Sequence, residues 1–289
     1  MTVRSAAPLP AVPDPEAPLA ASYHRLADAL PALRIHCAST RPGDDPGADR
    51  DHGRGEGRGH GWVRAADLAQ LPGVLAESVA RESREAARRY GAAPRPDVAA
   101  GLCLHRYAWP VALAFTLPWF LERRVPRLPV ERVAVRHGGS ELSLATDEFS
   151  CLPDDPRAGL PGARVVPDET ALERALLAGL VEHLTPVLAA FRPLVRRGPR
   201  TLWGLATDEV VEGLWYLGGL LGEEERAVAE LTRLLPGTPR PPFTGGAGFE
   251  LLERPGAEPL RTRTRVSCCL FYTIRPAEAC FGCPRTANI

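Results

Sequence analysis

The 289-residue sequence contains no lysine and only one methionine, and its 35 arginines are balanced by 35 acidic residues. A chain without net charge has no general electrostatic attraction to nucleic acid or to an anionic membrane surface. No helix-turn-helix pattern is recognisable either, so we predict no nucleic-acid partner. Arginine without lysine, together with abundant Ala, Pro and Gly, is what a GC-rich coding sequence produces, and it indicates no function by itself.

Long hydrophobic runs are also missing. The most apolar stretch, residues 107–121, is interrupted by Pro110 and Pro118 and is shorter than the roughly 20 residues that a spanning helix needs. We interpret it as a buried core helix, with contact to a membrane surface as the alternative. The N-terminal residues contain no continuous apolar segment typical of a secretory signal, so we expect a cytoplasmic protein, free or at the inner face of the cell membrane.

Motifs for hydrolytic and nucleotide-dependent chemistry are absent from the sequence. We find no Ser-His-Asp pattern, no P-loop and no dinucleotide-binding GxGxxG. The chemistry-bearing residues that remain are the cysteines.

Helical periodicity dominates the chain. The spacing of apolar residues predicts helices over residues 23–34, 65–90, 97–122, 168–195, 201–221 and 223–235. Residues 1–20 are rich in Pro and Ala and predict a flexible leader. The Gly, Asp and Arg run at 41–61 predicts a solvated loop, and residues 236–250 predict another loop.

Two segments have the two-residue alternation of strands. Residues 130–135 and 141–146 predict a β-hairpin that turns at Gly138 and Gly139. Residues 260–267 predict a strand with Arg261, Arg263 and Arg265 on one face. The expected fold class is α+β, mainly helical with a small antiparallel sheet and a cysteine-rich segment at the C-terminus.

Seven cysteines occur in the chain, and four of them fall within the last 22 residues: Cys268, Cys269, Cys280 and Cys283. In a reducing cytoplasm this crowding favours a metal over disulfides. Four soft thiolates are the ligand set of a 2Fe-2S cluster, in which each iron takes two sulfurs from the protein. The sequence therefore predicts a 2Fe-2S cofactor and one-electron chemistry, while leaving open which cysteines share an iron.

Two other interpretations of these cysteines are a zinc site and a redox dithiol. A zinc site usually has two pairs with two to four residues between the ligands of each pair, which the adjacent Cys268 and Cys269 do not provide. A redox dithiol at Cys280 and Cys283 would leave the first pair without a role. Neighbouring residues on a strand point to opposite faces, so Cys268 and Cys269 can serve one cluster only if the strand ends and the backbone turns.

The remaining three cysteines, Cys37, Cys103 and Cys151, stand alone in apolar surroundings. Single cysteines of this kind usually behave as small buried hydrophobic residues. We exclude them from the predicted site.

The Cys-Cys-x10-Cys-x2-Cys pattern resembles the signature of the ferric-siderophore reductase (FhuF-like) family, which is described as cytoplasmic 2Fe-2S proteins that reduce iron carried by hydroxamate siderophores. TLWGLATDEV, residues 201–210, resembles the Leu-Trp-Gly segment that precedes the cysteines in such proteins, although Leu205 stands where an Asn is expected. The resemblance covers residues 60–289. It implies that one electron passes to hydroxamate-bound Fe(III) and releases Fe(II).

These expectations define three regions and the partners. Residues 1–20 form the leader, 21–240 a helical and hairpin region facing the substrate, and 241–289 the 2Fe-2S binding region. The expected partners are a ferric hydroxamate siderophore and an unidentified electron donor. The alternative is a 2Fe-2S electron carrier or redox sensor without a siderophore substrate.

Arginines and aromatic residues near the cysteines are secondary candidates. Cations beside the cluster raise its potential. The arginines that could do so are Arg263, Arg265, Arg275 and Arg285. The aromatic candidates for a siderophore surface are Trp203, Trp215, Tyr216, Phe271 and Tyr272, with the two tryptophans expected in the core.

Overall fold

The computed structural model describes residues 17–37, 61–238, 240–254, 256–278 and 283. The predicted leader and the 41–61 loop lie almost wholly outside the described residues. Cys280 and Arg285 lie outside them as well.

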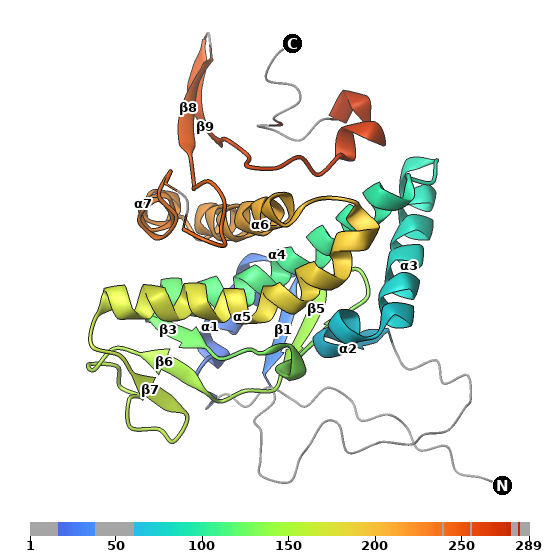
Figure 1. Ribbon diagram of the computed structural model, residues 1–289. Coiled ribbons are helices and arrows are strands. Elements are labelled where there is room, and N and C mark those ends of the chain that lie inside the picture. Colours follow the sequence, from blue (N-terminus) through green and yellow to red (C-terminus); the bar gives the residue numbers. More distant parts are fainter. Residues whose placement is uncertain (1–16, 38–60, 239, 255, 279–282, 284–289) are drawn as a thin grey trace, which may run out of the picture.

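Helices make up most of the described chain, and α4 lies at their centre. It packs against α1, α3, α5 and α6 (Figure 1). The helices are α1 (Ala20–Ala29), α2 (Ala65–Gln70), α3 (Pro72–Tyr90), α4 (Pro96–Glu122), α5 (Glu169–Val195), α6 (Pro199–Leu220) and α7 (Glu224–Leu234).

Nine strands in the described residues form three small sheets, in the orders β1-β5-β4-β2, β3-β6-β7 and β8-β9. The strands are β1 (Arg34–Cys37), β2 (Trp62–Arg64), β3 (Arg124–Pro126), β4 (Val133–Arg136), β5 (Glu141–Leu144), β6 (Phe149–Cys151), β7 (Ala163–Val165), β8 (Phe249–Arg254) and β9 (Ala257–Arg263). The α+β class is as predicted, but the pairs β1–β5 and β6–β7 are parallel, so two of the sheets are mixed rather than antiparallel.

Two predicted helices have different bounds. The helix expected over 23–34 ends at Ala29, and Arg34 begins β1 instead. The helix expected over 65–90 is broken at Leu71, whose backbone is extended (φ −112°, ψ 99°), because the ring of Pro72 disfavours helical geometry in the residue before it.

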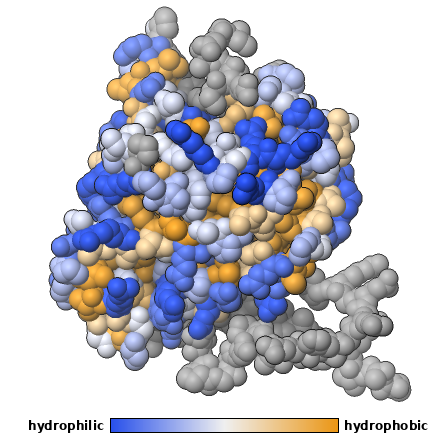
Figure 2. Space-filling model, viewed as in Figure 1, coloured by the Kyte–Doolittle hydropathy of each residue, from blue (hydrophilic) through white to orange (hydrophobic). Residues whose placement is uncertain are grey.

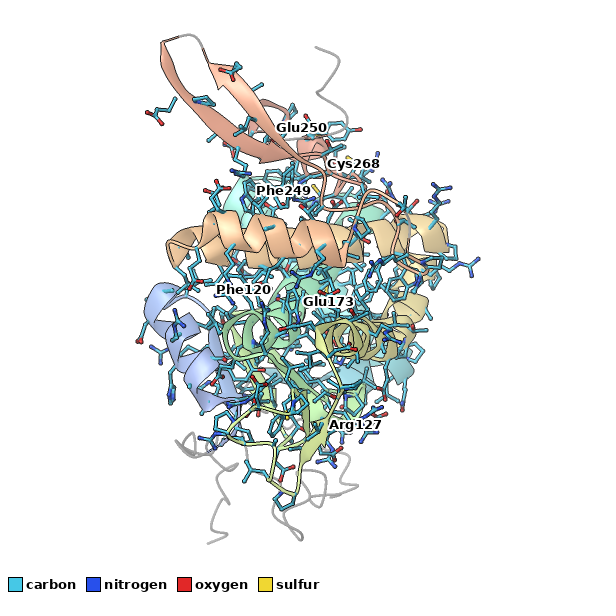
Figure 3. All side chains as sticks on the ribbon, turned by 90° about the vertical axis from the view of Figure 1, so that its left-hand side faces the viewer. Phe120, Arg127, Glu173, Phe249, Glu250 and Cys268 are labelled. Carbon is cyan, nitrogen blue, oxygen red and sulfur yellow. The ribbon has the colours of Figure 1, made fainter. Side chains whose placement is uncertain are left out.

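The predicted strand over 260–267 is also shorter than expected. It ends at Arg263 and pairs with β8, which begins inside the segment predicted as a loop. The short runs η2 (Phe271–Thr273) and η3 (Pro276–Glu278) follow it as 3-10 helices, and η1 (Val130–Arg132) precedes β4. The β8–β9 hairpin projects from one end of the molecule, beside α6 and α7 (Figures 1 and 3).

Helices α4 and α5 are long and apolar enough to cross a membrane by length and composition. In the most apolar window of α4, 72% of the residues are buried, which is typical of the core helix of a soluble protein. The corresponding share in α5 is 39%, and apolar residues are visible in a band across the middle of the face where α5 lies (Figure 2). Two such helices are weak evidence for a membrane span.

Candidate metal centre

The cysteine segment leaves β9, crosses α6 and reaches α4. Cys268 and Cys283 are buried with Val98 of α4 and Leu270 in a small apolar cluster that is separate from the main core. Cys269 is half-buried. Figure 3 shows Cys268 near the base of the β8–β9 hairpin, above α6. The structure therefore brings three of the four predicted ligands, all that it describes, to one end of α4.

The backbone turns at the adjacent cysteines. Leu270 has a left-handed backbone (φ 63°), and its N–H donates a hydrogen bond to Cys268 Sγ at 3.4 Å. Because β9 has already ended at Arg263, Cys268 and Cys269 are not held on the opposite faces of a strand. The strand has ended and the backbone turns, which is the geometry that allows Cys268 and Cys269 to serve one cluster.

Asp208 of α6 holds the segment that precedes the cysteines. Its carboxylate accepts hydrogen bonds from the backbone N–H groups of Val266 (3.0 Å) and Ser267 (2.9 Å) and from the Ser267 hydroxyl (3.1 Å). It also pairs with Arg263 Nη1 at 2.8 Å. With Asp208 only 1% exposed and Arg263 3% exposed, these bonds form away from water and are strong and directional.

Glycines let the segment approach both helices closely. A Cβ atom at Gly204 of α6 would lie 3.2 Å from Thr244 Oγ1 and 3.3 Å from Val266 Cγ1 and Ser267 Cβ. A Cβ at Gly101 of α4 would lie 3.9 Å from the Cys269 carbonyl oxygen. The absence of a side chain at Gly204 therefore sets how deeply the segment docks on α6.

The three described cysteine thiols interact electrostatically. Burial is the largest cause of the raised pKa of Cys268, and Cys269 and Cys283 raise it further. Clustered thiolates repel each other and are costly to bury unless a cation compensates them. Within the described residues, no group of three His, Cys, Asp or Glu side chains has the geometry of a closed metal site, and Cys280 is not among the residues described. The soft donor set itself fits iron and sulfide.

His105 of α4 lies beside Cys269. Its Nδ1 atom is 2.7 Å from Oε1 of Glu209, a carboxylate that is 4% exposed. Glu209 is the largest cause of the raised pKa of His105, and the Cys269 sulfur adds to it. The sequence patterns do not predict His105, Asp208 or Glu209 as site residues. The signal for the two acids is the segment TLWGLATDEV, which contains both.

The predicted arginines point to carboxylates of α6 and to the surface. Arg263 Nη2 and Arg265 Nη2 reach the same oxygen of Glu212, at 2.9 and 2.6 Å. Arg275 pairs with the exposed Glu278. Only Arg261 and Arg263 belong to β9, so the predicted arginine face ends before Arg265.

Most of the candidate aromatic residues pack against other rings. The ring centroids of Trp203 and Phe243 are 5.3 Å apart, and those of Trp215 and Phe249 are 5.6 Å apart. Both tryptophans pack against the main core. They are partly buried and lie against the core rather than within it.

Among the remaining aromatic candidates, Phe271 packs on Tyr90 of α3, and Tyr272 packs beside the buried cysteines. Tyr216 is 48% exposed. Of the five candidate rings it is the one classed as exposed, whereas the other four are partly buried.

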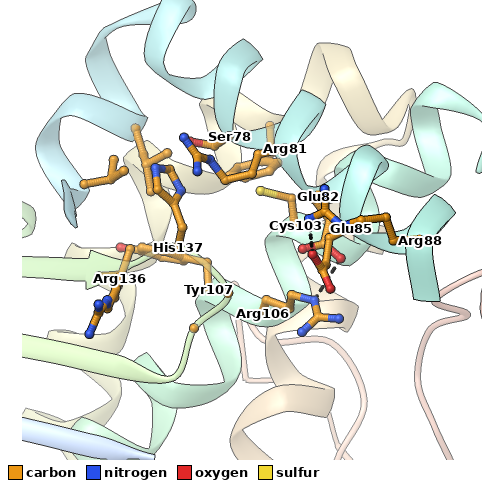
Figure 4. Close-up of a pocket in the computed structure, with 16 residues that line it drawn as sticks. Ser78, Arg81, Glu82, Glu85, Arg88, Cys103, Arg106, Tyr107, Arg136 and His137 are labelled. Atoms are coloured by element: carbon orange, nitrogen blue, oxygen red, sulfur yellow. Dashed lines mark hydrogen bonds and ion pairs between the residues drawn. The ribbon is translucent and has the colours of Figure 1, made fainter. Parts of the chain in front are cut away.

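A separate cavity of about 360 Å³ lies between α3, α4 and the β4–β5 turn (Figure 4). Arg106 crosses its floor and donates from Nε to Glu82 at 2.8 Å. Cys103 lines it, and burial raises the pKa of this thiol to about 12, so that it stays neutral. None of the described C-terminal cysteines lines this cavity, which we regard as distinct from the metal centre.

Residues 265–285 match the family model of the FhuF 2Fe-2S C-terminal domain. The C-terminal segment is similar to this domain over those residues. Its cofactor is a 2Fe-2S cluster, which removes the zinc and dithiol interpretations. All four predicted ligands lie inside the FhuF-type segment. A search of curated proteins finds no match to the chain.

Proposed function

We propose that the chain is a ferric-siderophore reductase, with Cys268, Cys269, Cys280 and Cys283 as the cluster ligands. The observation that carries this proposal is the FhuF-type segment, whose described cysteines gather at one end of α4. When bound, the 2Fe-2S cluster supplies one electron at a time. We place the reaction in the cytoplasm, where reducing conditions keep the thiols free.

The chain's own residues hold the cysteines and limit access of water. Asp208 fixes the backbone at Val266 and Ser267, immediately before the first ligand. Val98 and Leu270 cover Cys268 and Cys283. A cluster that gains and loses an electron without changing its geometry requires ligands that are held rigidly and partly shielded from water.

The reaction needs only an electron. Hard hydroxamate oxygens hold Fe(III) much more tightly than Fe(II), so one-electron reduction of the bound iron is sufficient to release it. The electron leaves the reduced protein, which returns to its oxidised state and must be reduced again by a one-electron donor. No nucleophile or general base is required, in agreement with the absence of such motifs from the sequence.

The test is reoxidation of the reduced protein by its substrate. Protein reduced with dithionite and freed of excess reductant should be reoxidised by ferrioxamine, and Fe(II) should be trapped by a ferrous-specific chelator in proportion to protein. The alternative is an electron carrier or redox sensor. If the reduced protein ignores every ferric hydroxamate but exchanges electrons with ferredoxins or flavodoxins, that alternative holds and the reductase proposal fails.

The ligand assignment has a separate test. The purified protein should contain about two irons and two acid-labile sulfides per chain, because four thiolates hold one cluster. Changing any of Cys268, Cys269, Cys280 or Cys283 to Ser should abolish or greatly alter the visible spectrum. Cys103→Ser is the matched control, since Cys103 is half-buried and outside the segment. Loss of the cluster in that control, or its retention in a ligand variant, would contradict the assignment.

A further inference from the structure

A second hollow, of about 460 Å³, runs along the seam between α4 and α6. Its α4 wall contains His105 and Trp109, and its α6 wall contains Glu212 and Tyr216. The α1–β1 loop, which contains Leu33, and the β4–β5 turn close the far side. A volume of this size is within the roughly 300–1,000 Å³ of small-molecule sites.

The His105 end of the groove lies nearest to the cysteine segment, none of whose described residues lines the groove. Gly101, which faces the Cys269 carbonyl, precedes His105 by one helical turn, or about 6 Å along α4. Trp109 follows one turn later, about 12 Å from the same point. On the opposite wall, Glu212 receives Arg265, three residues before Cys268. A ligand in the groove would therefore lie next to the segment that holds the cluster.

Aromatic surface is available at the outer end of the groove. The ring centroids of Trp109 and Tyr216 are 6.2 Å apart, with their planes tilted by 57°. The Trp109 indole rests on α6 at Gly213, where a Cβ would meet its Nε1 at 3.6 Å. Tyr216, in contrast, has about half of its surface exposed to solvent (48%). Such rings contact the carbon skeleton of a ligand while their polar edges remain in water.

Every charged side chain that lines the groove has an opposite charge beside it. His105 is paired with Glu209, Arg106 with Glu82, and Glu212 with Arg263 and Arg265. The walls therefore offer little uncompensated charge, which favours a neutral ligand over a polyanion. A ferric tris-hydroxamate is uncharged at its iron centre, because three hydroxamate anions balance Fe(III). A ferric tris-catecholate carries three negative charges.

We propose that the α4–α6 groove, with Trp109 and Tyr216 as its aromatic wall, binds the ferric tris-hydroxamate chelate and excludes anionic catecholates. This inference rests on the proposed function and adds to it the place where the substrate binds and a physical basis for its charge preference. Because the segment contacts α4 at Gly101 and α6 at Glu212, a substrate iron in the groove would have a short path to the electron source.

Binding can be measured without electron transfer by using gallium(III), which has the charge and size of Fe(III) and is redox-inert. Calorimetric titration of the oxidised holoprotein with gallium ferrioxamine should give a dissociation constant that rises about fivefold to tenfold in Tyr216→Ala and in Trp109→Leu. Leu220→Ala is the matched control, since Leu220 lies one turn further along α6, is similarly exposed (45% against 48%) and does not line the groove. A gallium tris-catecholate should bind at least about tenfold more weakly than the hydroxamate chelate.

The outcomes separate this proposal from the function on which it rests. If the wild type reduces ferrioxamine but Tyr216→Ala and Trp109→Leu bind the gallium chelate as the wild type does, the groove is wrong and the reductase stands. Equal affinity for the catecholate would overturn the charge class. If the wild type neither binds the gallium chelate nor reduces the ferric one, the proposed function fails, and the groove assignment fails with it. Unchanged cluster spectra and thermal unfolding in both variants show that they are folded.

Discussion

At the scale of single residues, Asp208 organises the approach to the cysteines. One buried carboxylate accepts two backbone N–H bonds and one hydroxyl bond and pairs with a buried guanidinium. Without this carboxylate the two backbone N–H groups and the Ser267 hydroxyl would lose their acceptor, and Arg263 would keep Glu212 as its only carboxylate partner among the described residues. An unpaired buried donor costs more free energy than one hydrogen bond normally contributes. Asp208 is thus a positioning residue for the metal centre.

Asp208→Asn tests this role. The amide keeps the shape of the side chain but removes its charge, and it places an N–H₂ group against donors. We expect the free energy of unfolding, measured with urea, to fall by about 3 kcal/mol, as when one partner of a buried ion pair is removed. The cluster spectrum should also change, which a purely global loss of stability would not cause while the protein remains folded.

Glu278→Gln is the control for this substitution. It breaks the exposed pair with Arg275 in the same segment, where solvent screens the charges. The free energy of unfolding and the spectrum should both stay at wild-type values. If the two variants behave alike, the role assigned to Asp208 is wrong.

At the scale of elements, the cysteine segment is docked on a helix surface with room for backbone but not for a side chain. Gly204→Val would place a branched side chain against Val266 and Ser267, both of which already lie 3.3 Å from the Cβ position. Because Asp208 ties these two residues to the same helix, they cannot retreat without losing their hydrogen bonds. We expect Gly204→Val to lose most of its iron and sulfide, measured per folded chain.

Gly219→Ala is the matched change on the same helix. A Cβ there meets nothing within 4 Å, so the substitution should keep the cluster and can stabilise α6 by up to about 1 kcal/mol through helix propensity. A Gly204→Val protein with full cluster content would show that the segment docks elsewhere.

The sequence was sufficient to predict the long elements. Apolar periodicity placed α4 to within one residue, and the acidic start at Asp168 marked α5, where its carboxylate caps the Ala171 N–H at 2.8 Å. The Cys-Cys-x10-Cys-x2-Cys spacing was sufficient for the cofactor. These signals are local, because the apolar residues that define a helix and the cysteines that bind the cluster each lie within one short segment of the chain.

What the sequence did not predict depends on contacts between distant segments. The strand β1 follows α1 after only a few residues, and its partner β5 lies more than a hundred residues further along. The adjacent Leu251 and Leu252 of β8 break the alternation that marks a half-buried strand, because both are exposed on the hairpin. Likewise, Asp208 and His105 became part of the site only once α4 and α6 were placed beside the cysteines.

At the scale of the whole molecule, two apolar clusters are present among the described residues. The main core joins all seven helices, and the smaller one joins Val98 to the cysteines. The global stability therefore depends mainly on the main core, whereas the metal centre depends on how the C-terminal segment is attached to it. A buried polar group in the main core should affect the first and leave the second intact.

His183 is such a group, because it links α5 to α4 and to the loop before η1. Its Nδ1 atom lies 2.6 Å from the Leu128 carbonyl oxygen, which can only accept, so Nδ1 carries the proton. Nε2 then accepts from the Tyr107 hydroxyl at 2.6 Å. The ring is fully buried in its neutral form, and burial lowers its pKa from 6.5 to about 4.

This pKa makes the stability of the fold depend on pH. Above pH 6.5 His183 is neutral in both the folded and the unfolded chain, and its contribution is at its full value. As the pH falls from 6.5 to about 4, the unfolded chain binds a proton that the folded one does not, so the free energy of unfolding decreases. The decrease from this residue amounts to about 3 kcal/mol at the lower end.

Urea unfolding measured across this pH range should show the decrease. The dependence of the unfolding free energy on pH should be lost in His183→Gln and kept in His24→Gln, which changes an exposed residue of α1. Equal slopes in the wild type and His183→Gln would assign the acid sensitivity to other groups. A cluster spectrum altered in folded His183→Gln at neutral pH would show that the two apolar clusters are not independent.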